Sequence, residues 1–384
     1  MNAWFPHPLR NRFLAELEHI TGGTLALTTP DGRTLRFGDG PEVGITLRDW
    51  ALLPSLAARG DIALGEGYAA GLWQTDDLEA ALILLLRNAE SLPRFARQSP
   101  LARAGLTAAD RLLRANSLQG ASRNIRAHYD VGNAFYQLWL DRGMTYSSGI
   151  FAQGDDLEAA QHRKNERILD LLGDGERVLE IGCGWGGFAE AASARGRYVT
   201  GLTLSPAQAG YAEARLDGRA EIRLQDYRKT TGTYDNIVSI EMIEAVGEHW
   251  WPTYFRQIAD RLNDGGRAVI QAITVPDQHF SVYRKRSDYI RRHVFPGGML
   301  PCHSAMTHAA GQAGLRLRSQ FAFGQDYART CRIWADNMQA ERARILRLGH
   351  DTTFLRSWHY YLMACAATFA TGRTDVVQLE FARG

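Results

Sequence analysis

The alternation of hydrophobic and polar positions predicts a small N-terminal domain over residues 1–100. TLALTTPDGRTLRFG places a PDG turn between two alternating runs, a pattern typical of a hairpin. The segment from Leu47 to Asn88 predicts short helices broken by glycines, and the last of them is amphipathic, with Asp76 and Asp77 at its start. We therefore expect this domain to be mainly helical.

From about residue 128, short apolar strands alternate with helical segments. A helix is predicted to begin at Pro206 and another to span Trp250–Leu262, and VVQLEF predicts a late strand. This rhythm predicts an α/β domain over 128–384, with a mostly parallel sheet covered by helices on both faces. The five predicted strands are RVLEI (177–181), YVTGLTL (198–204), AEIRLQ (220–225), NIVSI (236–240) and RAVIQAI (267–273).

Composition narrows the class of protein further. The 384 residues carry 44 basic and 42 acidic side chains, a net charge of +2, which gives no overall attraction to nucleic acid. The four cysteines form no CxxC pair, so neither a disulfide framework nor a metal site is predicted, and a reducing compartment is expected. The start lacks the apolar core of a signal peptide, and the longest apolar run, Leu82–Leu86, is too short to span a bilayer.

The join between the two domains, residues 101–127, is rich in arginine. One interpretation is a solvated helix and linker; the other is a surface that docks on anionic phospholipid, where each basic side chain contributes about 1 kcal/mol. The basic residues in and just before this join are Arg94, Arg97, Arg103, Arg111, Arg114, Arg123 and Arg126.

A glycine-rich turn follows the first strand of the larger domain. In EIGCGWGG (180–187) the glycines permit close approach of a ligand, and the next helix offers free N–H groups. A nicotinamide cofactor requires an acid at the end of the second strand, but LTLS has none before Glu213. Glu180, directly before GCG, is instead typical of S-adenosylmethionine sites. A purely structural turn is the alternative.

Several stretches, in the same order along the chain, resemble the cyclopropane-fatty-acid synthases and the related mycolic-acid cyclopropane synthases. They are LGEGYAAGLWQTDDL (64–78), HYDVGNAFYQLWLDRGMTYSSGIF (128–151), VLEIGCGWGGFA (178–189), GLTLSPAQ (201–208), LQDYR (224–228), SIEMIEAVGEHWWPTYF (239–255), FPGGMLP (295–301), FGQDYARTCRIW (323–334) and HYYLMACAATF (359–369).

The resemblance implies a Rossmann-like S-adenosylmethionine methyltransferase domain and an N-terminal domain, 1–100, that docks on lipid. It implies transfer of the methyl carbon to the double bond of an unsaturated phospholipid acyl chain, giving a cyclopropane. We accordingly expect a cytoplasmic homodimer, peripheral on the inner face of the membrane, with no nucleic-acid partner. A methyltransferase for a soluble small molecule and a non-catalytic lipid- or cofactor-binding homologue are the rival hypotheses.

The resemblance also places the cofactor contacts. It assigns them to Tyr146, Ser147, Gly182, Gly184, Thr203, Leu204 and Gln208, and it places Asp226, Tyr227 and Ile240 beside the adenine. For Tyr146, Ser147 and Tyr227, ordinary packing at the edge of the core is the alternative.

The resemblance also implies a bound bicarbonate ion, which acts as the base that removes a proton from the transferred methyl group or as the relay to that base. The matching positions here are Ser148, Glu244, Gln271, Ile273 and Tyr327. Ser148 and Gln271 replace a cysteine and a histidine, and glutamine cannot exchange protons near neutral pH.

Glu241 stands where the resembling family usually has glycine, three residues before Glu244. It is either a solvated loop acid or a second carboxylate in the proton-accepting region, with at least one pKa raised. Because Ser148, Gln271 and Glu241 alter the bicarbonate pocket, the alternative product is a methyl- or methylene-branched acyl chain instead of a ring.

The segment Ser281–Pro301 combines basic and aromatic side chains. It is either a solvated helix or the entrance of the acyl tunnel, where cations meet lipid phosphates. The cations are Arg284, Lys285, Arg286, Arg291 and Arg292.

Overall fold

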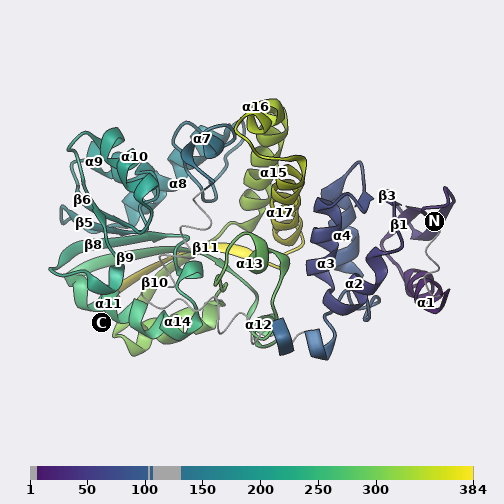
Figure 1. Cartoon of the computed structure of the whole chain (residues 1–384). Helices are drawn as coiled ribbons and strands as arrows, with labels where there is room; N and C mark the ends of the chain where they lie inside the picture. Colours follow the sequence, from purple (N-terminus) through teal and green to yellow (C-terminus); the bar gives the residue numbers. More distant parts are fainter. Residues whose placement is uncertain (1–6, 103, 107–130, 384) are drawn as a thin grey trace.

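The computed structural model describes residues 7–102, 104–106 and 131–383. Figure 1 shows the N-terminal elements on one side of the molecule and a larger α/β domain on the other. The predicted linker, 101–127, lies almost entirely outside the described residues, and so do Arg103, Arg111, Arg114, Arg123 and Arg126. The two alternatives for that join therefore remain predictions, as do the domain boundaries.

The N-terminal domain packs helices against a four-stranded sheet of order β2-β1-β3-β4. The predicted hairpin is confirmed, because β1 and β2 pair antiparallel. Strands β3 and β4 were not predicted; β3 carries several exposed positions and β4 has only two residues. The elements are α1 (His7–Leu17), β1 (Gly23–Thr28), β2 (Thr34–Asp39), β3 (Glu42–Leu47), α2 (Leu52–Arg59), α3 (Asp61–Ala69), β4 (Trp73–Gln74) and α4 (Leu78–Arg87).

The larger domain is built on a seven-stranded sheet of order β10-β11-β9-β8-β5-β6-β7. Five strands are parallel, and β11 pairs antiparallel with both β9 and β10. The mostly parallel α/β fold is thus confirmed. The strands are β5 (Arg177–Ile181), β6 (Tyr198–Thr203), β7 (Glu221–Leu224), β8 (Tyr234–Ile240), β9 (Leu262–Thr274), β10 (Leu315–Ala322) and β11 (Asp375–Arg383).

Helices cover both faces of this sheet, and polar side chains set where several of them begin. Ser205 accepts a hydrogen bond from the Gln208 N–H and Pro206 occupies the first turn, so α10 starts where the sequence predicts. The helices are α7 (Asn133–Tyr136), α8 (Leu157–Leu171), α9 (Gly187–Ala194), α10 (Pro206–Leu216), α11 (Trp251–Arg261), α12 (Asp277–Tyr283), α13 (Tyr289–His293), α14 (His303–Gln312), α15 (Gly324–Ala340), α16 (Arg342–Arg347) and α17 (Thr352–Ala370). Short 3-10 turns, η1 (Tyr227–Lys229), η2 (Ile243–Ala245) and η3 (Glu248–Trp250), follow β7 and β8.

Helix α17 joins the two domains. It packs against α15 within the larger domain and against α3 and α4 of the N-terminal domain. Polar contacts also connect the two domains: Arg356 donates to the Tyr68 carbonyl at 2.6 Å, and the Arg332 guanidinium pairs with Glu79 at 2.6 Å. Apolar side chains from both domains consequently form one continuous core.

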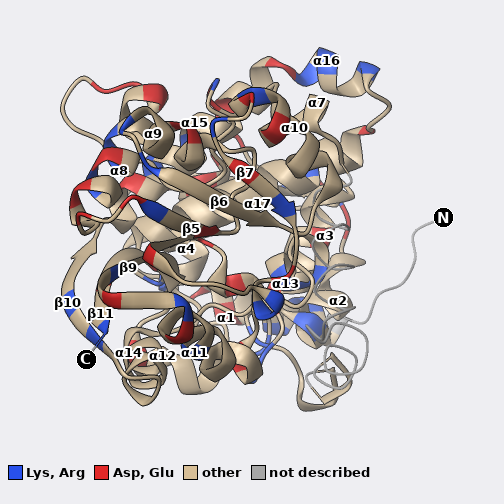
Figure 2. Cartoon of the chain, turned by 90° about the vertical axis from the view of Figure 1, so that its left-hand side faces the viewer, with Lys and Arg blue, Asp and Glu red and all other residues tan. Residues whose placement is uncertain are grey.

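Charge is spread over the surface without one dominant sign. Figure 2 shows basic and acidic residues interspersed along most elements, with basic residues on α16 and α13. Among the residues that the structure describes, no helix is long and apolar enough to cross a membrane.

Candidate active site

The glycine turn after β5 opens the backbone toward a cavity. Gly182 and Gly184 have positive φ, +86° and +52°, which glycine adopts without steric cost. The N–H groups of Gly182 and Cys183 donate to the Leu202 carbonyl at 3.0 and 2.8 Å, which ties the turn to β6. A Cβ at Gly182 would approach the Met242 side chain to 2.8 Å, so glycine is required there.

One cavity of about 930 Å³ lies at the carboxyl ends of the parallel strands, where open α/β sheets bind their ligands. Nine of the ten predicted cofactor residues line it: Tyr146, Ser147, Gly182, Gly184, Thr203, Leu204, Gln208, Tyr227 and Ile240. Asp226 does not line the cavity, and its carboxylate is paired with the Arg228 guanidinium at 2.6 Å.

Thr203 and Gln208 show a polar surface suited to a nucleoside. The Thr203 hydroxyl donates to Gln208 Oε1 at 2.8 Å, and both residues are buried beside the cavity. A hydroxyl and an amide thus stand at the end of β6, where a dehydrogenase would place an acid. This donor set fits the ribose and amino-acid groups of S-adenosylmethionine.

Glu241 is held by three hydrogen bonds inside the cavity wall. Its Oε1 accepts from the Ser148 N–H at 2.9 Å and from Gln271 Nε2 at 2.7 Å, and its Oε2 accepts from the Tyr327 hydroxyl at 2.5 Å. Burial raises the pKa of Glu241, while Tyr327, Ser148, Gln271 and the Lys164 ammonium oppose that rise. The interpretation of Glu241 as a solvated loop acid is therefore wrong.

The backbone at Glu241 has φ of +50°, in the left-handed region that favours glycine. A side chain there costs roughly 1–3 kcal/mol unless its contacts compensate. Its three hydrogen bonds supply that compensation, so this conformation is held by the site itself.

Glu244 lies beside Glu241 and has a different environment. Its Oε1 accepts from the Ile273 N–H at 2.5 Å, and its Oε2 is buried without a hydrogen-bond partner among the described residues. Burial and the neighbouring Glu241 raise the pKa of Glu244 to about 8. Glu244 is therefore mainly protonated at neutral pH.

These contacts decide whether bicarbonate fits. Three of the five residues assigned to the ion, Ser148, Gln271 and Tyr327, already donate to Glu241, and the fourth donor, the Ile273 N–H, serves Glu244. A further anion would meet a carboxylate at the place where the donors converge. The residues present do not fit a bicarbonate ion, and no step is assigned to one.

Ser148 and Gln271 lie behind the carboxylates, fully buried, and do not line the cavity. Gln271 Oε1 accepts from Gln378 Nε2 at 3.0 Å, which fixes the direction in which the Gln271 amide points. These two residues orient Glu241, whereas Glu241, Glu244, Ile273 and Tyr327 line the cavity.

Two further ionisable residues of this site are buried, and one of them, Lys164, was missed from the sequence. Lys164 on α8 is 1% exposed and donates to the Ser147 hydroxyl at 2.9 Å, and burial lowers its pKa to about 8. Glu180 was singled out only as part of the cofactor motif; burial raises its pKa to about 8. A lysine in LEAAQHRKNERILDL carries no pattern that distinguishes it from its solvated neighbours.

Aromatic side chains surround the space in front of the two glutamates. The Tyr146 and Phe295 rings lie 6.3 Å apart, Phe295 and Tyr361 lie 5.9 Å apart, and Tyr327 stacks on Phe369 at 4.4 Å. All five line the cavity. Ring faces attract cations, and the apolar walls exclude water, so this region can stabilise positive charge on a bound hydrocarbon.

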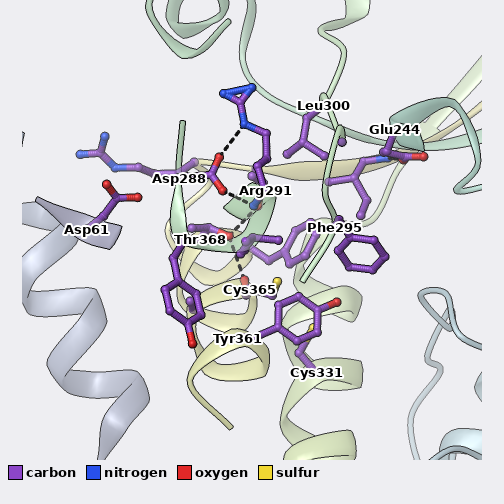
Figure 3. Close-up of a pocket in the computed structure, with 18 of the residues that line it drawn as sticks. Asp61, Glu244, Asp288, Arg291, Phe295, Leu300, Cys331, Tyr361, Cys365 and Thr368 are labelled. Carbon is purple, nitrogen blue, oxygen red and sulfur yellow. Dashed lines mark hydrogen bonds and ion pairs between the residues drawn. The ribbon is translucent and has the colours of Figure 1, made fainter. Parts of the chain in front are cut away.

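The basic segment 281–301 contributes to the cavity through two short helices, α12 and α13, and not as a single solvated helix. The Arg291 guanidinium pairs with Asp288 at 3.1 Å and is largely buried, whereas Arg284 pairs with Glu248. Figure 3 shows Asp288 and Arg291 between Asp61 of α3 on one side and Phe295, Leu300 and Glu244 on the other.

The sheet order, the glycine turn and the polar end of β6 define an S-adenosylmethionine-dependent methyltransferase, and S-adenosylmethionine is its cofactor. The chain belongs to the mycolic acid cyclopropane synthetase family, which it matches over residues 116–379. This membership confirms the resemblance and the prediction of an enzyme.

Two similar proteins show the range of reactions among relatives. The chain is 36% identical over 354 residues to a tuberculostearic acid methyltransferase of Mycobacterium tuberculosis, covering 87% of this chain and 81% of that protein. It is 33% identical over 331 residues to the cyclopropane-fatty-acyl-phospholipid synthase of Escherichia coli, covering 85% and 84%. These relatives support methylation of lipid acyl chains.

Solved structures agree with this assignment. The cyclopropane synthase MmaA2 of Mycobacterium tuberculosis matches with a TM-score of 0.65 at 28% identity, covering 68% of this chain and 98% of that one. The mycolic acid cyclopropane synthase CmaA1, solved with SAH and CTAB, matches with a TM-score of 0.64, also at 28% identity, covering 68% and 97%.

Proposed function

We propose that this enzyme transfers the methyl carbon of S-adenosylmethionine to the double bond of an unsaturated acyl chain in a phospholipid. The bound cofactor supplies an electrophilic methyl group. The observation that carries the proposal is the cavity, which runs without a break from the glycine turn, past Glu241 and Glu244, into an apolar aromatic space. An alkene is a weak nucleophile, so orientation of the chain is a large part of the catalytic work.

Methyl transfer leaves a positive charge on the acyl chain. The aromatic faces of Tyr146, Phe295 and Tyr361 stabilise this charge, and the apolar cavity excludes the water that would otherwise attack it. A proton is then lost to a base in the wall. We assign Glu241 as that base, because it lines the cavity and three hydrogen bonds fix the position of its carboxylate oxygens, whereas burial and Glu241 raise the pKa of Glu244 to about 8.

We propose a methylene-branched acyl chain as the product. Its formation requires a 1,2-hydride shift that moves the positive charge onto the carbon bearing the new methyl group, after which Glu241 takes a proton from that methyl group. The specific observation is that Glu241 occupies the donors predicted to hold the ring-closing bicarbonate. A tuberculostearic acid methyltransferase, at 36% identity, is the relative that supports a branched product. A cyclopropane is the second candidate product, supported by the relative from Escherichia coli, at 33% identity.

Incubation with cis-unsaturated phospholipid vesicles and methyl-deuterated cofactor tests this function. A product one methylene heavier that retains two deuteriums shows transfer followed by proton loss. Hydrogenation then separates the candidates, since a branched alkene takes up hydrogen and a cyclopropane resists it under mild conditions. Failure to release S-adenosylhomocysteine in a lipid-dependent manner would refute the transfer itself.

The site of action is also part of the proposal. A phospholipid substrate places the enzyme at a membrane surface, and we propose peripheral binding on the inner face of the membrane by a cytoplasmic homodimer. Exposed cations such as Lys285 and Arg97 support attraction to anionic lipid. Sedimentation with anionic vesicles, weakened by salt, tests the attraction, and analytical ultracentrifugation tests the dimer.

A further inference from the structure

The cavity that contains Glu241 and Glu244 continues out of the larger domain into the N-terminal domain. Its far part is lined by apolar side chains from α1, the small sheet, α2 and α4, namely Phe13, Leu27, Leu47, Leu53, Leu82 and Leu86. The cavity therefore has two apolar arms: a catalytic arm, which ends at the glutamates and aromatic rings, and an N-terminal arm, formed by these six residues.

Polar residues line the cavity where the two domains meet, and we call this region the neck. It consists of Asp61, Arg97, Ser287, Asp288 and Arg291, all lining the cavity. Gln98 Nε2 donates to the Ser287 carbonyl at 2.5 Å, which joins the N-terminal domain to this segment.

The neck carries charges of both signs. The Arg291 guanidinium pairs with Asp288 at 3.1 Å and lies 4.8 Å from the Tyr283 ring centre, so it is held in place. Arg97 is exposed at the same neck, and burial together with the nearby Asp288 raises the pKa of Asp61 to about 7. Figure 3 shows Asp61 facing Asp288 across the neck. The exposed Arg97 guanidinium is thus the group of the neck that can pair with a ligand phosphate, since the Asp288 carboxylate is paired with Arg291.

Two apolar arms that meet at a polar neck match the shape of one lipid class. A single-chain lipid has one apolar tail, whereas a diacyl phospholipid has two tails that meet at a polar glycerol phosphate. We propose that the second, non-reacting acyl chain of the phospholipid substrate occupies the N-terminal arm. This inference rests on the proposed function and assigns a further binding site within the same cavity.

The physical reason lies in the lifting of a lipid out of the bilayer. When the reacting chain enters the catalytic arm, its partner chain leaves the membrane with it. Each CH₂ group then left in water lowers affinity about fourfold. An apolar arm connected to the same cavity removes that loss. The cavity volume of about 930 Å³ lies at the upper end of the range for ligand pockets, roughly 300–1,000 Å³.

The test compares two substrates with the same cis-unsaturated reacting chain, a diacyl phospholipid and its lysophospholipid, each in detergent micelles. Leu86→Trp fills the N-terminal arm from α4. The control Arg87→Trp adds the same ring at the adjacent exposed position, which does not line the cavity. We expect wild-type kcat/KM to favour the diacyl substrate by about tenfold or more.

Leu86→Trp should lower kcat/KM for the diacyl phospholipid about tenfold and leave the lysophospholipid within about threefold, and Arg87→Trp should change neither. Ala89→Trp, also facing the N-terminal arm, provides a second obstruction, and thermal unfolding shows that each variant is folded. Equal losses on both substrates, or none on either in folded variants, would overturn the inference while leaving the methyl transfer intact. Absence of wild-type transfer to either lipid would instead overturn the proposed function.

Discussion

Replacement of Glu241 by glutamine tests the proton-accepting step most directly. The change keeps the size of the side chain and removes its charge and basicity. A positioned general base contributes about 10²–10⁴ in rate, which is roughly 3–5 kcal/mol of activation free energy. We expect kcat of Glu241→Gln to fall by that factor.

The contacts of Glu241 also predict that cofactor affinity stays unchanged in this variant. Glu241 contacts Ser148, Gln271 and Tyr327, none of which is among the side chains assigned here to the nucleoside at the end of β6. The Kd for S-adenosylmethionine should therefore stay within about threefold of wild type. Glu248→Gln is the matched control, since Glu248 pairs with Arg284 away from the cavity and its loss should not alter kcat.

Stopped-time assays measure S-adenosylhomocysteine release, which reports methyl transfer, and modified lipid, which reports product formed after proton loss. A Glu241→Gln variant that is folded and keeps kcat within threefold of wild type would show that Glu241 is not the base. Glu241→Gly adds a rescue test. Glycine suits the φ of +50° and frees the three donors, so added bicarbonate or formate should restore part of the lost activity.

Three further predictions follow from neighbouring residues. The Glu244 pKa of about 8 exceeds its unfolded value of 4.5, so the folded protein binds an extra proton between these values, and its stability should fall as pH rises from about 4.5 to 8. Glu244→Gln should flatten this pH dependence in thermal unfolding, and an unchanged slope would contradict the assignment. Tyr327→Phe removes a donor to the Glu241 carboxylate, so the acid limb of the kcat–pH profile should move to higher pH and kcat should fall about tenfold; a profile identical to wild type would oppose this. Gly182→Ala, with φ of +86° and Met242 2.8 Å from the new Cβ, should weaken S-adenosylmethionine binding about tenfold or more by calorimetry, while Gly196→Ala, at φ of +78° in open space, should not.

The central strands of the sheet were predictable because they are buried on both faces. RVLEI coincides with β5 residue for residue, since a mainly apolar run bounded by a glycine turn has few alternatives. Strand β10 was missed because it lies at the edge of the sheet with many exposed positions, so its sequence lacks that apolar signal.

The site was only partly predictable, because hydrogen-bond partners come from distant elements. The spacing of Glu241 and Glu244 indicated two neighbouring carboxylates, but Tyr327, from α15, decides that Glu241 is held as an acceptor. The same limit applies to Phe295 and Tyr361: the abundance of aromatic residues was evident, whereas their positions around the cavity depend on how α17 packs.

The charge balance of the site explains why Glu241 is suited to a cationic reaction. Burial raises the pKa values of Glu180 and Glu244 to about 8, so near neutral pH both are mainly uncharged, and Lys164 keeps most of its positive charge with a pKa also about 8. Burial raises the pKa of Glu241 as well, but Glu241 differs in that three hydrogen-bond donors and the Lys164 ammonium oppose that rise. A single fixed carboxylate beside aromatic walls attracts a developing cation and then accepts its proton, whereas three ionised carboxylates would repel one another and draw water into the cavity.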